Sequence, residues 1–123
     1  MKNFLQTCFI AVALSAAVAT KAQVPILSSN TASTAVMFLD FDGHTVQNTS
    51  WNVGGPMVMA PSGLMTTQIT DIFNRVAEDY RPFNINITTD STKFWAAPKA
   101  KRMRVILTTS WEWYGSAGGV AFV

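Results

Sequence analysis

Apolar residues recur along this chain with two different periods, and the change from one to the other falls at a proline. Over residues 69–80 the apolar side chains return every three or four positions, which places one face of an α-helix against a core. Pro82 disfavours a helical conformation for the residue before it. Over residues 83–88 apolar and polar residues then alternate, as in a half-buried strand. This part of the chain therefore predicts a helix that leads directly into a strand.

Two further apolar runs complete the predicted arrangement. Residues 35–41 are almost continuously apolar and end at the turn signal Asp42-Gly43, which is typical of a strand covered on both faces. Residues 103–108 form a similar run, for which we also expect a central position in the sheet. We interpret residues 44–60 as a long connection and Ser62 as the N-cap of the helix. Because strand-helix-strand crossovers join parallel neighbours, the predicted fold class is α/β with one long crossover helix.

The first 22 residues have the pattern of a secretory signal peptide. A basic residue precedes an apolar run over residues 4–19, and small residues then fit a cleavage after Ala22. The run is shorter than the roughly 20 residues that cross a bilayer, so we expect no membrane anchor in the mature chain. We expect the protein to be secreted or periplasmic, with a flexible lead-in over residues 23–34 and one domain over residues 35–123.

Without the signal peptide the charge of the chain is balanced. The whole chain has 9 basic and 7 acidic residues, and both Lys2 and Lys21 lie in the segment to be removed. Cys8 lies there too, so the mature chain has no cysteine and no disulfide. The four basic residues between Lys99 and Arg104 form a local patch that we interpret as solvated. We therefore expect no nucleic-acid partner.

Asp40-Phe41-Asp42-Gly43, at the end of a predicted strand, resembles the first motif of haloacid-dehalogenase-type phosphatases. In that family the motif reads DxDGT, and the resemblance would make Asp40 the nucleophile and Asp42 the general acid of a Mg2+-dependent phosphatase. His44 stands where the family has threonine, although Thr108 or Thr109 could serve its second motif. The alternative interpretation is a turn whose carboxylates cap the next segment or join a structural cation site.

Aromatic residues suggest a different alternative, a secreted binding domain. Flat apolar rings stack on sugars, and two of these side chains, Trp111 and Trp113, would share a face if the chain were extended there. The simpler interpretation is that the rings pack at the margins of the core. The aromatic residues in question are Trp51, Trp95, Trp111, Trp113 and Tyr114.

Taken together, FLDFDGHT (residues 38–45), Trp51-Asn52, the helix-to-strand phrase VAEDYRPFNINITT and GGVAFV (residues 118–123) resemble the amino-terminal half of secreted, metzincin-like zinc metalloproteases. The resemblance covers nearly all of the chain from about Ala35. It implies a mixed, twisted sheet with one long helix packed on it, the upper half of a metzincin catalytic domain. The parent would be a zinc endopeptidase with a peptide or protein substrate.

The catalytic segment of that family, HExxHxxGxxH, is absent from this chain, which has only one histidine, His44. A catalytic zinc site needs three protein ligands, so we expect this fragment to bind no zinc and to be inactive by itself. No catalytic or metal-ligating residue can be assigned by resemblance. Because the chain ends on apolar residues, we expect it to be truncated. The resemblance also implies an edge strand that pairs with extended substrate, formed by Gly119, Val120, Ala121, Phe122 and Val123.

Overall fold

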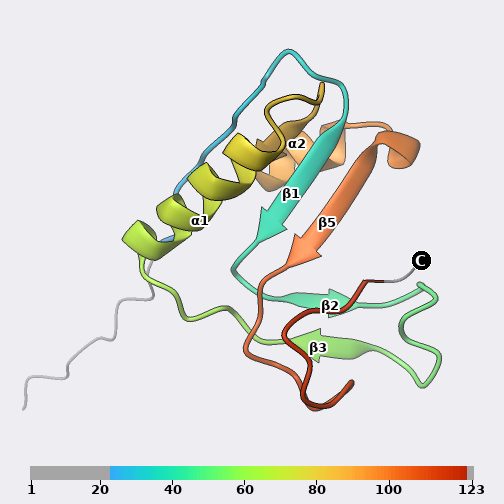
Figure 1. The fold of residues 1–123 in the computed structure, drawn as a ribbon. Coiled ribbons are helices and arrows are strands. Elements are labelled where there is room, and N and C mark those ends of the chain that lie inside the picture. The colour runs from blue at the N-terminus through green and yellow to red at the C-terminus, as the bar shows by residue number, and fades with distance from the viewer. Residues whose placement is uncertain (1–22, 122–123) are drawn as a thin grey trace, which may run out of the picture.

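The structure is a computed structural model that describes residues 23–121, so the predicted signal peptide lies outside the described residues (Figure 1). It has a mixed α/β fold with five strands, two helices and one 3-10 turn in this range. In chain order these are β1 (Val36–Asp40), β2 (His44–Val46), β3 (Met57–Met59), α1 (Thr66–Asp79), β4 (Asn86–Thr88), α2 (Ser91–Ala96), the 3-10 turn (Lys99–Lys101) and β5 (Arg102–Ile106).

β1 lies in the middle of a three-stranded parallel sheet with the order β4-β1-β5. Met37 of β1 is in register with Ile87 of β4 on one side and with Met103 of β5 on the other. The predicted parallel β-α-β arrangement of β1, α1 and β4 is therefore confirmed. The prediction of a central position for β5 was wrong for the described sheet, in which β5 is an edge strand.

The strand after the crossover helix is shorter and more deeply buried than its alternating pattern predicted. All three residues of β4 are buried on both faces, including the polar Asn86 and Thr88. Phe83, expected to face the core, is 63% exposed. The chain turns before the strand begins, with the Phe83 amide donating to the Tyr80 carbonyl (3.0 Å), and this turn carries Phe83 away from the sheet.

Alternate side chains of β1 pack on opposite faces of the sheet, and each face has its own helix (Figure 1). On one face Met37 and Leu39 join Ile69 and Phe73 of α1. On the other face the core comprises Val36 and Phe38 of β1 with Phe94 and Ala97 in and after α2. The sequence did not predict α2, whose N-cap is Asp90. Two covered faces explain why residues 35–41 are apolar without a period.

The crossover helix begins later than predicted. Met65 is its N-cap, and the Met65 amide donates to the side-chain oxygen of Gln68 (2.9 Å). The assignment of Ser62 as N-cap was wrong, because the helix begins only at Thr66; the Ser62 amide donates to the carbonyl of Phe41 (2.9 Å). This bond ties the approach of the helix to the end of β1.

The long connection between β1 and α1 contains an antiparallel hairpin, β2–β3, which the sequence did not predict. Gly43 allows the chain to turn into it, with φ of +91° and with Met59 O only 2.9 Å from the position that a Cβ would occupy. The segment after β5 lies against the hairpin, since the Ala60 amide donates to Ser110 Oγ (2.9 Å) and Thr108 Oγ1 donates to Ala60 O (2.7 Å). The hairpin therefore lies at the carboxyl ends of β1 and β5 (Figure 1).

The segment expected to be a flexible lead-in instead runs along the outer edge of β4. The Ser29 amide donates to Ile87 O (3.0 Å), and the Thr89 amide donates to Leu27 O (3.0 Å). The side chain of Asn86 accepts from the amides of Ser29 (3.1 Å) and Asn30 (3.0 Å). These hydrogen bonds hold the segment against β4. The small, polar composition of the segment does not predict them.

The last part of the chain departs from the expected edge strand. Gly119, Val120 and Ala121 do not form a strand, and Phe122 and Val123 lie outside the described residues. Within residues 23–121 neither helix has the length and apolar character that crossing a membrane requires.

Candidate functional site

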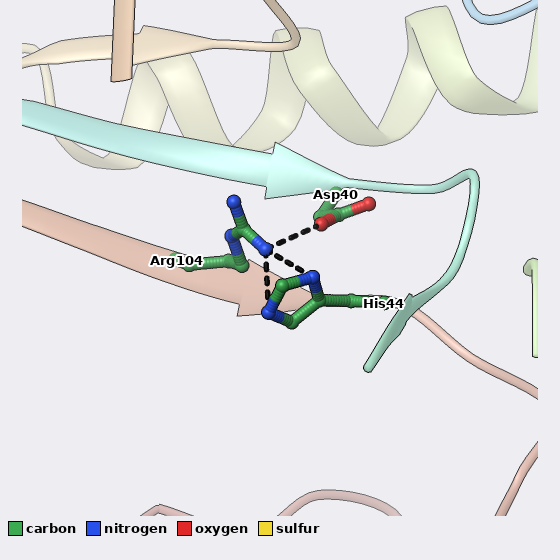
Figure 2. A network of polar contacts seen from close by, with 3 residues as sticks. All are labelled: Asp40, His44 and Arg104. Atoms are coloured by element: carbon green, nitrogen blue, oxygen red, sulfur yellow. Dashed lines mark hydrogen bonds and ion pairs between the residues drawn. The ribbon is translucent and has the colours of Figure 1, made fainter. Parts of the chain in front are cut away.

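Three polar side chains from three different strands meet where the sheet joins the hairpin. Asp40 is the last residue of β1, His44 is the first residue of β2, and Arg104 lies in β5 (Figure 2). Arg104 Nη1 lies 3.5 Å from Asp40 Oδ2 and 2.6 Å from His44 Nε2, and it also contacts His44 Nδ1. The guanidinium group therefore bridges the carboxylate and the imidazole ring.

Local structure explains why these side chains converge. Phe38 and Asp40 lie two residues apart on β1 and so share one face of the sheet, the face that α2 covers. The turn at Gly43 brings His44 back over the end of β1. The Arg104 guanidinium lies 5.5 Å from the Phe38 ring centre and 4.8 Å from that of Phe94, within the range of cation–π attraction. The contacts with these two rings therefore help to position the Arg104 guanidinium, independently of its ion pair with Asp40.

The cluster is largely shielded from water. The side chains of Arg104 and Asp40 are 13% and 4% exposed, and two of their polar atoms, Asp40 Oδ1 and Arg104 Nε, are buried with no hydrogen-bond partner in the part of the chain that the structure describes. Burial, followed by the neighbouring carboxyl of Asp42, raises the pKa of Asp40 to about 7, and Arg104 only partly opposes this. Asp40 is therefore a carboxyl group that takes up a proton near neutral pH.

Burial also acts on His44, in the opposite direction. It lowers the pKa of the imidazole from its ordinary value, and the positive charge of Arg104 adds to the effect, while Asp42 opposes it. The ring is consequently neutral at pH 7. A neutral imidazole has one unprotonated nitrogen, which can accept a hydrogen bond from the Arg104 guanidinium.

This arrangement does not fit a metal site. Between residues 23 and 121 there is no group of three histidine, cysteine, aspartate or glutamate side chains that could hold a metal ion. Asp42 is exposed, and Arg104 occupies the space between Asp40 and His44 with a positive charge. The residues in this range do not bring together the donor set that a catalytic zinc requires.

The proposed phosphatase residues are not arranged for attack on a phosphate ester. Asp40 is only 3% exposed, and its carboxylate faces a guanidinium rather than solvent. Asp42, in contrast, lines a cavity of about 260 Å³ at the carboxyl ends of β1 and β4, which Asp90 also lines. The hydroxyl of Thr108 donates to Ala60 O (2.7 Å). The structure thus buries one carboxylate of the motif and exposes the other, although the two remain close enough to interact.

The aromatic residues near the hairpin form a cluster of their own. The rings of Trp51 and Trp113 are 5.7 Å apart in an edge-on contact, and those of Trp113 and Tyr114 are 5.4 Å apart. The segment is not extended, because the amides of Tyr114 and Gly115 both donate to the Trp111 carbonyl (3.1 and 3.0 Å) and close a turn. Trp111 and Trp113 therefore do not form a flat platform along one face of a strand.

Arg104 is the member of the polar cluster that sequence reasoning missed. From the sequence alone, Arg104 is assigned to a solvated basic patch. In the structure its side chain instead contacts His44, which lies 60 residues earlier in the chain. A signal existed in the alternation of Arg102 and Arg104 with Met103 and Val105, the period of a strand with two different faces.

Comparison of the chain with known protein families, with curated proteins and with solved structures finds no match.

Proposed function

We propose that this chain is the amino-terminal part of a secreted zinc endopeptidase, and that it supplies scaffold rather than catalytic groups. The proposal starts from the resemblance of its motifs to metzincin-like metalloproteases. It is supported by the packing of one long helix, α1, on one face of the sheet, as the resemblance implies, although the three-stranded sheet is parallel rather than mixed (Figure 1). The parent reaction would be hydrolysis of peptide bonds in a peptide or protein substrate.

The observation that carries the scaffold role is the burial of Asp40 within the FLDFDGHT motif. Its polar residues Asp40 and His44 face Arg104 instead of an open cleft, and together the three tie β1, β2 and β5 into one unit. A group that binds substrate must be accessible to it, and the side chain of Asp40 is buried. Residues of this kind hold the sheet and hairpin in place, which a catalytic centre supplied from elsewhere would need.

The two alternatives have less support. A phosphatase requires an accessible aspartate nucleophile, and Asp40 is buried beside a cation. A sugar-binding surface requires open ring faces, and Trp51 and Trp113 are packed edge to face against each other. Neither arrangement provides the accessible groups that its function needs, whereas the contacts of Asp40, His44 and Arg104 directly support a structural role.

The deciding experiment is to sequence the reading frame after Val123 and to express the extended product. We expect an HExxHxxGxxH segment downstream and hydrolysis of a casein substrate that a chelator abolishes. Replacing the glutamate of that segment by glutamine should abolish hydrolysis while leaving the circular dichroism spectrum unchanged. A frame that contains no such segment would remove the proposal.

A second measurement concerns the chain itself. Purified and titrated with zinc, the 123-residue chain should show no stoichiometric binding at submicromolar concentration, because the described residues offer no three-ligand site. Tight zinc binding that disappears in His44→Ala would place ligands in this part of the protein and contradict the scaffold assignment.

A further inference from the structure

The charges of this domain are unevenly distributed, although they balance. Two of the chain's 9 basic residues precede residue 23, and five of the other seven lie between Lys93 and Arg104. That stretch has no acidic residue, so all 7 acidic residues of the chain lie outside it. Arg104 pairs with Asp40 inside the domain, which leaves four basic residues of this stretch for the surface.

The fold places the two kinds of charge on opposite sides of the sheet. α1 and α2 cover opposite faces of it (Figure 1). α2 and the 3-10 turn that follows it carry three lysines and no acidic residue, whereas α1 carries three acidic residues and one basic one. The lysines are Lys93, Lys99 and Lys101, and the charged residues of α1 are Asp71, Arg75, Glu78 and Asp79. The domain is therefore electrically polarised, with its basic side where α2 ends.

The basic side chains of this region are available to a partner. Lys93, Lys99 and Lys101 are exposed, and none of them forms an ion pair within residues 23–121. Lysine is almost never fully buried unless it is paired. A further part of a parent protein would therefore cover this surface only by supplying negative charge to it.

An aromatic side chain lies among these lysines. Trp95, near the end of α2, is 60% exposed. The Arg102 guanidinium lies 4.8 Å from its ring centre, and Arg102 Nη1 donates to the Trp95 carbonyl (3.1 Å). These contacts hold the end of α2 against the start of β5, so the indole and the 3-10 turn between them belong to one surface. An exposed indole beside free basic side chains is the composition of protein surfaces that lie at the boundary of a membrane.

The packing of Trp95 distinguishes between possible anionic partners. Nucleic acids and sugars use the open face of an aromatic ring for stacking. Arg102 already lies over the Trp95 ring, and the Phe94 ring packs against it edge-on at 4.9 Å. A membrane boundary needs no stacking partner, because an indole enters it as an apolar body with a polar N–H group. A lipid surface therefore fits this aromatic residue better than a polysaccharide or a nucleic acid.

We propose that the surface formed by Lys93, Trp95, Lys99, Lys101 and Arg102, the basic face, binds the anionic phospholipids of a membrane surface. The basic side chains would contact the phosphate groups, and the Trp95 indole would enter the boundary between head groups and acyl chains. The acidic helix α1 would then face away from the membrane. This inference does not depend on the proposed function, because it uses only the charge and exposure of α2 and the 3-10 turn.

The first test is co-sedimentation of the purified 123-residue chain with vesicles of phosphatidylcholine that contain about one third phosphatidylglycerol. We expect binding at least about tenfold stronger than to phosphatidylcholine alone, and weaker at high salt. Lys99→Gln combined with Lys101→Gln should weaken binding at least about tenfold, because each basic residue near an anionic surface contributes about fivefold. Arg75→Gln combined with Arg81→Gln removes two exposed charges at and after α1 and should leave binding unchanged.

Tryptophan fluorescence with brominated phospholipids locates the contact. All 4 tryptophans follow residue 22, so the first 22 residues give no signal, and they are identical in every variant. Bromine in the acyl chains should quench the wild type, and Trp95→Phe should remove most of this quenching. Trp111→Phe is the control, since Trp111 belongs to the segment that lies near the hairpin at the other end of the sheet, and it should leave the quenching in place.

Three results would overturn the proposal. They are equal binding to the two kinds of vesicle, equal binding of the wild type and the double lysine variant, and quenching that Trp95→Phe does not reduce. Circular dichroism of each variant shows whether it keeps the fold. Binding to heparin or to DNA without binding to the anionic vesicles would assign the basic face to a different polyanion, and the proposal would then be wrong as well.

Discussion

Arg104 reaches Asp40 diagonally across the sheet. The two side chains approach to 3.5 Å between Nη1 and Oδ2, yet the backbone register pairs Arg104 with Phe38 and Asp40 with Ile106. The guanidinium thus passes over the Phe38 ring toward the end of β1, where His44 enters from the hairpin. This diagonal contact makes the cluster a junction between the sheet and the hairpin.

Asp40→Asn should change how stability depends on pH. Burial raises the pKa of Asp40 to about 7, whereas the unfolded chain has a value near 3.8, so the folded state holds the proton more tightly. The contribution of Asp40 is therefore most favourable below about pH 4 and declines as the pH rises through about 7. Asparagine has no such decline, so relative to wild type the variant should gain stability as the pH rises.

Urea unfolding of both proteins at several pH values between about 4 and 8 measures this difference. His44 has the opposite sign, because its pKa is lowered and its contribution is lost as the pH falls below its ordinary value of 6.5. His44 is present in both proteins, so the difference between them isolates Asp40. A wild type that gains stability over the variant as the pH rises would contradict the raised pKa.

Arg104→Lys should destabilise the protein although it preserves the charge. The planar guanidinium contacts the Phe94 ring at 4.8 Å and bridges Asp40 and His44, and an ammonium group cannot reproduce this geometry. We expect the free energy of unfolding to fall by about 1 kcal/mol or more. Arg75→Lys is the control, since its pair with Asp71 is exposed and should change by less than about 0.5 kcal/mol.

Gly43→Ala should weaken the turn between β1 and β2. The residue has φ of +91°, and a Cβ there would lie 2.9 Å from Met59 O and 3.1 Å from the ring of Pro61. Thermal and urea unfolding should show a loss of more than about 1 kcal/mol. Gly54→Ala, at a glycine with no atom near its Cβ position, should stay within about 0.5 kcal/mol; equal losses for the two variants would refute the steric argument.

Asp90→Ala should destabilise α2 by removing its N-cap. The carboxylate accepts from the Thr92 amide (2.9 Å) and the Thr92 hydroxyl (2.7 Å), and these hydrogen bonds lower the pKa of Asp90. We expect a loss of about 1 kcal/mol at pH 7, measured by urea unfolding. Because the pKa is lowered, the part of the contribution that depends on the negative charge should be lost as the pH falls below about 3.8, so the difference between the variant and wild type should narrow there. Asp90→Asn keeps the acceptor and should cost much less.

The elements that could be predicted from sequence are those long enough to show a period or a continuous apolar run. β1, α1 and the parallel placement of β4 were predicted correctly. β2 and β3 have three residues each, too few to display alternation, and their pairing depends on the turn at Gly43. α2 has six residues, too few to display a helical period, and it follows β4 closely.

The site was less predictable because its contacts connect distant parts of the chain. The motif drew attention to Asp40 and His44, but their shared partner comes from β5. The neighbouring Arg102 likewise belongs to a packed structure rather than a solvated approach, since its Nη1 donates to the carbonyls of Trp95 (3.1 Å) and Ala97 (3.3 Å) at the end of α2. A local reading of charge cannot detect such partners, because they are brought together only by the fold.

The hydrogen bonds that Asn86 accepts from the N-terminal segment have a consequence for production of this protein in a glycosylating host. Asn86-Ile87-Thr88 is an acceptor sequence for N-linked sugar, but Asn86 is 2% exposed and its side chain accepts the amides of Ser29 and Asn30. A glycan attached there during synthesis would occupy the place of that segment and leave β4 unprotected. Asn48-Thr49-Ser50, with an exposed asparagine in the hairpin connection, would tolerate the same modification.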